Sequence, residues 1–335
     1  MIVTEKRFRN KVNWISIICA VLVVFLHSYA FNDIHVNHAA YHIEFFISRN
    51  IAQASVPTFF ALSAFLFYRN FDWSKLISKF SSRLRSLVIP YVIWNIISMM
   101  AFFFLSKLPF INTPPFDLNA HTILDGILFY RYNLVFWFVQ QLIILTYLFP
   151  LLYPLVKRKF IAIPLFFIML GIYGSGNTVF WYVELKALIF YFFGAYFAVH
   201  HQSAVVSHQK ITFWGICAFV ISQILIYSSY SEWPIVYIVT RLLMICAVFD
   251  LTSVLGKIDM PALLNCSFPI YAMHNLILET FNKAFSFVLT PGSNLILIDY
   301  FGSTVATIVI IMLANRFLLK RLPRVHNVLF GGRGK

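Results

Sequence analysis

Long apolar runs limit the possible folds of this chain more than any other feature. A membrane-spanning helix needs roughly 20 apolar residues in a row, and the sequence has about ten such segments between polar interruptions. They cover residues 14–31, 45–67, 87–105, 134–156, 160–173, 179–199, 211–227, 234–254, 262–287 and 298–319. Only 11% of the residues are charged, against roughly 25% in soluble domains. We therefore predict an all-α polytopic membrane protein with about ten transmembrane helices.

One stretch between these segments has a mixed pattern. It begins with the Pro-rich sequence LPFINTPPFDLN (108–119) and continues with HTILDGILFYRY (121–132). The second part fits a helix in the membrane interface, and it also fits a plain loop. No internal repeat, low-complexity tract or linker divides the chain, so a single domain over residues 1–335 is predicted.

The charge distribution predicts the orientation in the membrane. The formal net charge is +14, and most of the 26 Lys and Arg residues fall in segments on the same side as the N-terminus. Because cytoplasmic loops carry an excess of Lys and Arg, both termini are expected in the cytoplasm. The first run (14–31) is interpreted as a retained span rather than a cleaved signal peptide. Anionic lipid head groups and an anionic cofactor would suit this basic face, whereas nucleic acid is not an expected partner.

The cysteines give no sign of a metal site or of disulfides. All four lie in or beside apolar runs, and no CxxC or Cys/His ligand spacing occurs in the sequence. We interpret them as small core residues and predict no metal site. These cysteines are Cys19, Cys217, Cys246 and Cys266.

A few ionisable residues fall inside the apolar segments, where charge is costly and usually functional. They are His27, Glu184, Lys186, Arg241, Asp250 and His274. His27 ends the run VLVVFLH (21–27), where it could be a packed residue bonded to a backbone carbonyl or a functional group. Glu184 and Lys186 are expected near enough to the outer surface to be hydrated, and Asp250 near the inner interface. Arg241 is harder to dismiss, because a buried guanidinium needs an anionic or carbonyl partner. Trp137 fits an aromatic belt or a platform on which a sugar stacks.

Five segments together resemble one known family. They are CAVLVVFLHS (19–28), SVPTFFALSAFLF (55–67), RLRSLVIPYVIWN (83–95), FWFVQQLIILTYLFPLL (136–152) and SFPIYAMHNL (267–276). In this order they are similar to the acyltransferase-3 family, whose members are mostly bacterial membrane enzymes that acylate cell-envelope glycans. The chain departs from the family pattern in three places. Ser16 stands where the family often has an arginine, Ser86 replaces a second arginine, and Ser63-Ala64 replaces Ser-Gly.

The resemblance implies an acetyl-CoA-dependent O-acetyltransferase of the bacterial cytoplasmic (inner) membrane. Acetyl-CoA would be the acyl donor, a glycan or lipid-linked sugar the acceptor, and no cofactor would be permanently bound. His27 would be the general base, because a sugar hydroxyl needs a base within hydrogen-bond reach and imidazole suits that task.

The remaining candidate residues fall into three groups. His274 and Arg241 are candidates to stabilise the oxyanion that forms on the thioester. Lys11, Ser16, Arg83 and Arg85 are candidates to bind the donor. Trp137, Gln140 and Glu184 are candidates to contact the acceptor.

Other functions fit parts of the same sequence. A transporter or flippase of lipid-linked sugars would also have many spans and buried charges, although no repeated halves of the kind transporters often use are detectable. An inactive relative that only binds a glycan is a second alternative, given the replacements at Ser16 and Ser86. A third keeps the enzyme but transfers another acyl group, such as succinyl. A covalent acyl-cysteine route has no support beyond the presence of Cys19 and Cys266.

Overall fold

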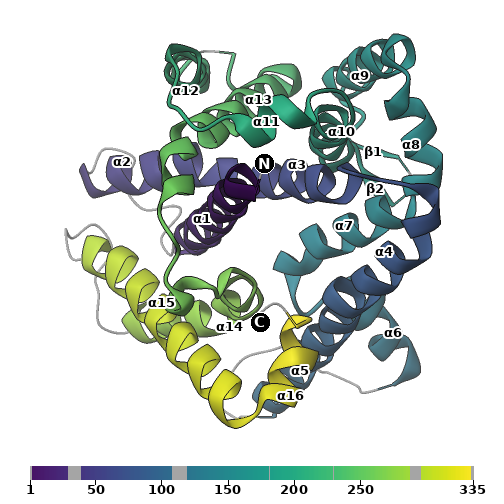
Figure 1. Cartoon of the computed structure of the whole chain (residues 1–335). Helices are drawn as coiled ribbons and strands as arrows, with labels where there is room; N and C mark the ends of the chain where they lie inside the picture. Colours follow the sequence, from purple (N-terminus) through teal and green to yellow (C-terminus); the bar gives the residue numbers. More distant parts are fainter. Residues whose placement is uncertain are drawn as a thin grey trace.

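The described part of the chain is helical apart from one short hairpin (Figure 1). The structure is a computed structural model, and it describes residues 2–28, 39–107, 119–180, 182–228, 230–286 and 296–332. The α-helices are α1 (Ile2–His27), α2 (Ala39–Phe45), α3 (Ser55–Tyr68), α4 (Leu76–Arg83), α5 (Ile89–Leu105), α6 (Ala120–Leu128), α7 (Trp137–Tyr147), α8 (Phe149–Lys157), α9 (Lys159–Gly174), α10 (Leu185–His200), α11 (Gln202–Ser207), α12 (Phe213–Ile226), α13 (Pro234–Leu251), α14 (Ser267–Ser286), α15 (Ile296–Arg321) and α16 (Pro323–Phe330). Short 3₁₀ or π-helical pieces cover Phe46–Ile51, Ala52–Ala54, Trp73–Lys75, Leu84–Val88, Leu134–Phe136, Ser253–Lys257 and Ala262–Leu264. The predicted all-α class is confirmed.

Several helices are long and apolar enough to cross a membrane. Five meet both criteria, and a sixth span results if the bent pair Leu134–Tyr147 and Phe149–Lys157 is counted as one. The five are Val3–His27, Ala39–Tyr68, Trp73–Leu105, Pro234–Lys257 and Leu297–Arg321. The apolar helices α9, α10 and α12 are shorter, and at 1.5 Å per residue each falls short of a hydrocarbon core about 30 Å thick. The chain is therefore a polytopic membrane protein in which each of the ten predicted segments coincides with a helix or a helix pair. Within the described residues, five or six of these helices meet both the length and the apolar criterion for a span.

The boundaries of several predicted segments differ from the structure, and two of these differences have a local explanation or fall partly outside the described residues. The first was expected over residues 14–31, but α1 already begins at Ile2 and ends at His27, and residues 29–31 lie outside the described part. The sixth was expected to start at residue 179, but residues 179–184 form the antiparallel hairpin β1 (Val179–Phe180) and β2 (Val183–Glu184). The Leu185 amide donates to the Thr178 carbonyl at 2.8 Å, which closes the hairpin before α10 starts.

The bend between α7 and α8 has a local cause. The two helices meet at Leu148 with an angle of 68°, and Pro150 lies in the first turn of α8. Proline has no amide hydrogen to continue the ladder of the preceding helix. The sequence around Pro150 thus breaks a segment that its apolar character alone predicts to be continuous.

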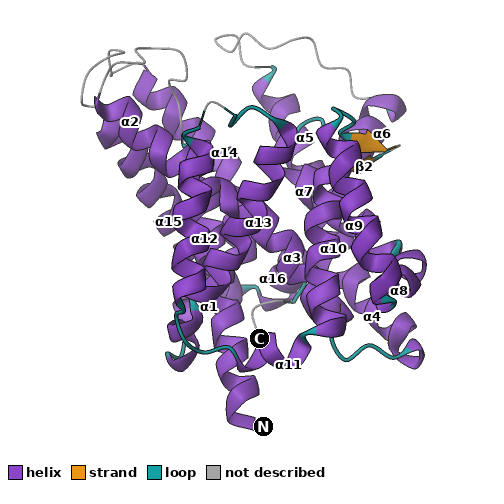
Figure 2. Cartoon of the chain, turned by 90° about the horizontal axis from the view of Figure 1, so that it is seen from above, coloured by secondary structure: helices purple, strands orange, loops and turns teal. Residues whose placement is uncertain are grey.

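The segments predicted to be cytoplasmic meet at one end of the bundle. Lys6 pairs with Asp259 at 2.9 Å, and Arg69 pairs with Glu5 at 2.9 Å. The hydrogen bond from Lys6, together with one from Asn10, holds the pKa of Asp259 below its ordinary value. This is the lower end in Figure 2, where the first turn of α1 and the helix α11 lie, whereas α6 and β2 lie at the upper end.

The stretch before α7 contains a short helix, α6. α6 starts after Asn119, whose side chain accepts a hydrogen bond from the Thr122 amide at 2.9 Å. Such an N-cap satisfies a helix donor that would otherwise have no partner. The helix option for HTILDGILFYRY is therefore correct, and the Pro-rich residues 108–118 lie outside the described part of the chain.

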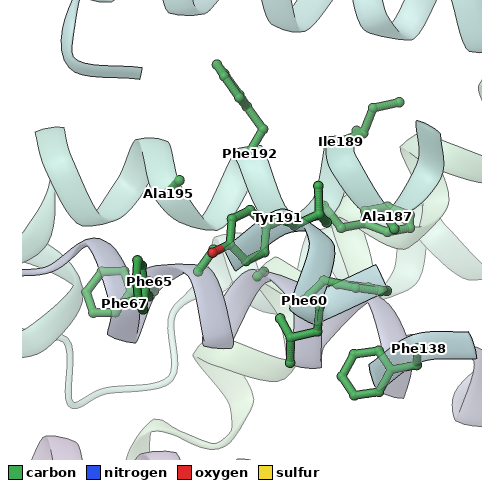
Figure 3. Close-up of a cluster of buried hydrophobic side chains, with 14 of the residues drawn as sticks. Phe60, Phe65, Phe67, Phe138, Ala187, Ile189, Tyr191, Phe192 and Ala195 are labelled. Carbon is green, nitrogen blue, oxygen red and sulfur yellow. The ribbon is translucent and has the colours of Figure 1, made fainter. Parts of the chain in front are cut away.

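A cluster of aromatic and small side chains forms the core between α3 and α10 (Figure 3). Phe60 of α3 packs edge-on against Phe138 of α7 with ring centroids 4.7 Å apart. The two helix backbones approach closely at Gly194, where an added Cβ atom would lie 2.0 Å from the Ala61 carbonyl oxygen. The segment SVPTFFALSAFLF is thereby fixed against the helices that bound the candidate site.

The last helix, α16, follows α15 and lies beside α5 (Figure 1). The Trp94 indole donates to the Leu329 carbonyl at 3.0 Å, and His326 is hydrogen-bonded to the Asn315 side chain at 2.8 Å. Phe330 is fully buried against Trp94 and Phe268. These contacts tie α16 to α5, α14 and α15.

Candidate active site

His27 is the last residue of α1, which lies near the middle of the helices in Figure 1. The next residue, Ser28, is buried and anchors the helix end. Its hydroxyl donates to the Val24 carbonyl at 2.9 Å and lies 2.5 Å from the Thr304 hydroxyl of α15. The apolar run that precedes His27 forms the helix, and Ser28 fixes where the helix ends, so the imidazole has a defined position.

A second histidine lies beside the first. The rings of His27 and His274 are 5.2 Å apart between centroids and tilted by 44°. His274 is fully buried in α14, and its Nδ1 lies 2.7 Å from the Tyr271 carbonyl oxygen. Because a carbonyl only accepts, Nδ1 carries the proton, and in the neutral ring Nε2 is then an acceptor. This Nε2 has no partner within the described ranges. The pairing of two histidines distant in sequence is the main feature of the site.

His27 lines a cavity of about 210 Å³, which we call the central cavity. Its walls come from the end of α1, the residues before and at the start of α3, and parts of α7, α10, α13 and α14. The residues with polar side-chain atoms that line it with His27 are Gln53, Trp137, Lys186, Tyr237 and Tyr271. Among the described residues that line the cavity, Lys186 is the one with a permanent charge. The predicted site residues His27 and Trp137 are thus brought together, while His274 lies behind His27.

Lys186 and Glu184 interact although they are two residues apart in the sequence. The Lys186 amine lies 3.5 Å from a Glu184 carboxylate oxygen and 4.9 Å from the centre of the Trp137 ring. Residues two apart on a helix do not face each other, but Glu184 belongs to β2 and α10 begins after it. The hairpin therefore makes the contact possible.

Gln141, rather than the predicted Gln140, supports this hairpin. The Gln141 amide group donates to the Tyr182 carbonyl at 2.8 Å and accepts from the Glu184 amide at 2.9 Å. Gln140 donates to the Leu128 carbonyl and does not line the central cavity. Glu184 does not line it either.

A second cavity of about 370 Å³, the inner cavity, lies nearer the start of α1. Asn13 and Ser16 line it from α1, and Arg83 lines it from α4. It meets the central cavity at Phe138 and Tyr271, which line both. Two of the predicted donor-binding residues, Ser16 and Arg83, therefore line one cavity, and this cavity shares two lining residues with the cavity of His27.

The other two predicted donor-binding residues lie elsewhere. The Lys11 amine donates to the Ser253 hydroxyl at 2.9 Å and lies 4.5 Å from the centre of the Phe249 ring. Lys11 is almost fully buried there, away from the inner cavity. Arg85 lies in the π-helical piece Leu84–Val88, is exposed, and does not line the cavity.

A third cavity of about 480 Å³, the outer cavity, continues beyond His27. It meets the central cavity at Gln53 and Tyr237. Arg241 lines this cavity and not the one that contains His27. The central cavity thus shares lining residues with both the inner and the outer cavity.

Some lining residues were missed from the sequence. Arg49, Asn50 and Gln53 lie in or next to the π-helical piece Phe46–Ile51. Arg49 falls inside the predicted segment 45–67, so it is also an ionisable residue within an apolar run, like Arg241. Asn50 and Gln53 are uncharged, and the sequence gives no comparable signal for them.

Comparison with known proteins supports the resemblance. A family model described as an acyltransferase domain, that of the acyltransferase-3 family, matches residues 9–316. No curated protein and no solved structure matches the chain. The match includes every residue that lines the three cavities.

Proposed function

This chain belongs to the acyltransferase-3 family, and on that premise we propose that it transfers an acetyl group from acetyl-CoA to a hydroxyl of a cell-envelope glycan. The proposed setting is the bacterial cytoplasmic membrane, with the basic end of the bundle in the cytoplasm. One observation carries the proposal: His27 lines a cavity that shares lining residues with a second cavity on one side and with a third that has no lining residue in common with the second. A base so placed can meet a donor from one side and an acceptor from the other.

The inner cavity is the proposed donor site. The nucleotide of coenzyme A is polyanionic and cytosolic, and Arg83 supplies a cation inside the cavity. Guanidinium groups bind phosphate in a bidentate manner. The long, thin pantetheine arm would then pass Phe138 and Tyr271 to bring the thioester to His27. Ser16 lines the same cavity and leaves open the space that an arginine would take.

The proposed reaction is a direct transfer. The acceptor hydroxyl oxygen attacks the thioester carbonyl carbon, so that a C–O bond forms and the C–S bond breaks. His27 takes the hydroxyl proton and returns it to the departing thiolate, which leaves as the thiol of coenzyme A. General base catalysis of this kind contributes roughly 10²–10⁴-fold. The carbonyls at the C-terminal end of α1 carry a partial negative charge, which favours the transient positive charge on His27.

His274 is proposed as a positioning residue for His27. With its Nδ1 proton committed to the Tyr271 carbonyl, a neutral His274 presents an acceptor at Nε2. Nε2 of His274 can therefore accept a hydrogen bond from the N–H group of the His27 ring. The other ring nitrogen of His27 is then free to act as the base, and His274 plays the part of the third group in catalytic triads. A neutral His274 cannot donate from Nε2, so an oxyanion role fits it less well than it fits Lys186. The Lys186 amine lines the central cavity and is a cation where the thioester oxygen would gain charge.

The test uses mass spectrometry of envelope polysaccharides. Cells with the intact gene, with a deletion, and with His27→Ala are compared, and the added mass distinguishes acetyl from succinyl. We expect acetylation with the intact gene and none in the other two strains. Acetylation that persists in the His27→Ala strain would contradict the role of His27, and acetylation that persists in the deletion strain would contradict the proposed function.

A further inference from the structure

The outer cavity contains polar groups that the reaction at His27 does not use. Its charged lining residues are Arg49, Arg241 and Glu232, a net positive set. Arg241 and Tyr237 come from α13, Arg49 and Asn50 from the π-helical piece after α2, and Glu232 from the loop before α13. A π-helical turn adds a residue to the helix and changes the direction of its side chains, and such turns are frequent at functional sites.

Two of these side chains are buried without adequate partners. Arg241 is 6% exposed, and within the described ranges no carboxylate pairs with it. The guanidinium contacts the Met244 sulfur at 3.7 Å and Tyr237, whose ring centre lies 4.9 Å from the guanidinium carbon and whose hydroxyl oxygen also lies near it. Its Nε has no hydrogen-bond partner among the described residues. Asn50 is fully buried, and both its Nδ2 and its Oδ1 have no partner in the described residues. A buried cation and a buried amide are both costly unless something pairs with them.

The position of this site relates it to the reaction. Tyr237 lies one helical turn before Arg241 and lines both the outer and the central cavity. Gln53 is also common to both. A ligand held at Arg241 therefore lies next to the space in front of His27, on the side away from the inner cavity.

We propose that the outer cavity binds an oxyanion, a phosphate or a carboxylate, that belongs to the acceptor. The Arg241 guanidinium would bind the anion through paired N–H donors, and the Asn50 amide would hydrogen-bond the same group or a neighbouring hydroxyl. The anion then holds the acceptor so that a hydroxyl enters the central cavity. The inference rests on the proposed function, and it narrows the acceptor to a negatively charged one. The anion is either the phosphate of a lipid-linked sugar or the carboxylate of an acidic sugar.

The test measures binding to the purified full-length chain in nanodiscs made of phosphatidylcholine alone, by isothermal titration calorimetry. The probes are inorganic pyrophosphate, glucuronate and glucose. We expect saturable binding of pyrophosphate or of glucuronate and none of glucose. Arg241→Gln should lower the affinity for the anion at least about tenfold, the usual effect of losing a charge-assisted hydrogen bond. Glu232→Gln removes a competing negative charge and should raise the affinity for the anion roughly twofold or more.

Arg131→Gln is the matched control, because Arg131 is exposed, pairs with Asp125 and does not line the cavity. It should leave binding unchanged. Tighter binding of pyrophosphate supports a phosphate-bearing acceptor, and tighter binding of glucuronate supports an acidic sugar. Absence of saturable binding, or binding that Arg241→Gln leaves intact, would overturn the proposal. If Arg241→Gln does not fold, an unchanged affinity in Glu232→Gln overturns it instead. No acetyl donor is present, so the outcome does not depend on whether the chain transfers acetyl groups.

Discussion

At the scale of single residues, the site combines one reactive group with several groups that fix or polarise its surroundings. His27 ends a helix, Ser28 locks that end to α15, and His274 lies against the imidazole. Lys186 reaches the same cavity from α10, held between the Trp137 ring and the Glu184 carboxylate. The charge of Lys186 is therefore positioned before any substrate arrives, which is what electrostatic stabilisation of an oxyanion requires.

Replacing Lys186 tests this assignment. Lys186→Met keeps much of the side-chain volume and removes the charge, so kcat should fall by roughly 10²–10³, the usual effect of losing one oxyanion-stabilising group. Lys186→Arg should retain more activity than Lys186→Met, because it keeps the charge. The measurement is the rate of acetyl transfer by the purified chain. If both variants act at the wild-type rate, Lys186 has no part in the reaction.

The ionisable residues of the site could be predicted from the sequence, whereas its uncharged polar residues could not. His27 and His274 stand out because an ionisable group within an apolar run is costly. Gln140 and Gln141 point about 100° apart on the helix. Because both have apolar neighbours in the sequence, the sequence does not indicate which of the two side chains faces the hairpin. The polar faces of Asn50 and Gln53 depend on a π-helical turn that the sequence does not reveal.

At the scale of elements, close packing of α3 against α10 shapes the wall of the central cavity. Gly194 allows the two backbones to touch, and Phe60 and Phe190 of these helices line the cavity itself. Any side chain at position 194 would push α10 away from α3. The helix that carries Lys186 would then move relative to the helix that follows Gln53.

Gly194→Ala is accordingly expected to destabilise the fold. The added Cβ atom would lie 2.0 Å from the Ala61 carbonyl oxygen, and overpacking of this kind costs about 1–3 kcal/mol. Gly171→Ala is the matched control, since a Cβ atom there meets nothing within 4 Å and alanine favours the helix. Thermal unfolding of the purified variants should show a lower midpoint for Gly194→Ala alone. Equal midpoints would contradict the close approach.

Helix identity could be predicted at this scale better than helix ends. The apolar runs identify the helices because backbone groups in lipid must be satisfied within the segment. Their ends depend on local groups: the hairpin before α10, the break at Pro150, and the cap at Asn119. Of these, only Pro150 is visible in the sequence as a breaker.

At the scale of the whole molecule, three cavities lie within the bundle, and His27 lines the one that shares lining residues with both of the others. They are formed by helices far apart in the sequence, chiefly α1, α3, α7, α13 and α14. Sequence order does not specify which of ten apolar helices are neighbours, so the cavities could not be predicted from apolar patterning. The family resemblance could indicate that a donor path exists, but not which residues line it.

Blocking the inner cavity tests the donor path. Ser63 lines that cavity on α3, so Ser63→Trp should fill it and raise the KM for acetyl-CoA at least about tenfold, as loss of productive binding does. Ser63→Ala keeps the space and should behave as wild type. Thermal unfolding shows whether the tryptophan variant is folded. A folded Ser63→Trp chain with normal KM would exclude this route for the donor.

The orientation of the bundle can be measured directly. Lys75 and His121 are exposed at opposite ends of the bundle. In a chain without its natural cysteines, His121→Cys should react with a membrane-impermeant maleimide in cells whose outer layers admit the reagent. Lys75→Cys should react only after the cytoplasmic membrane is opened, because the basic end is expected inside. The reverse pattern would invert the proposed roles of the inner and outer cavities.

The central claim is that His27 removes the proton of the acceptor hydroxyl during acetyl transfer. The most direct test is the rate of acetyl transfer from acetyl-CoA by the purified chain, compared with His27→Gln, which keeps a polar side chain but is not a base. We predict a fall in kcat of at least about 100-fold, with the KM for acetyl-CoA within about threefold of wild type, because the donor binds in the inner cavity. A His27→Gln chain whose kcat stays within a few-fold of wild type would contradict the claim.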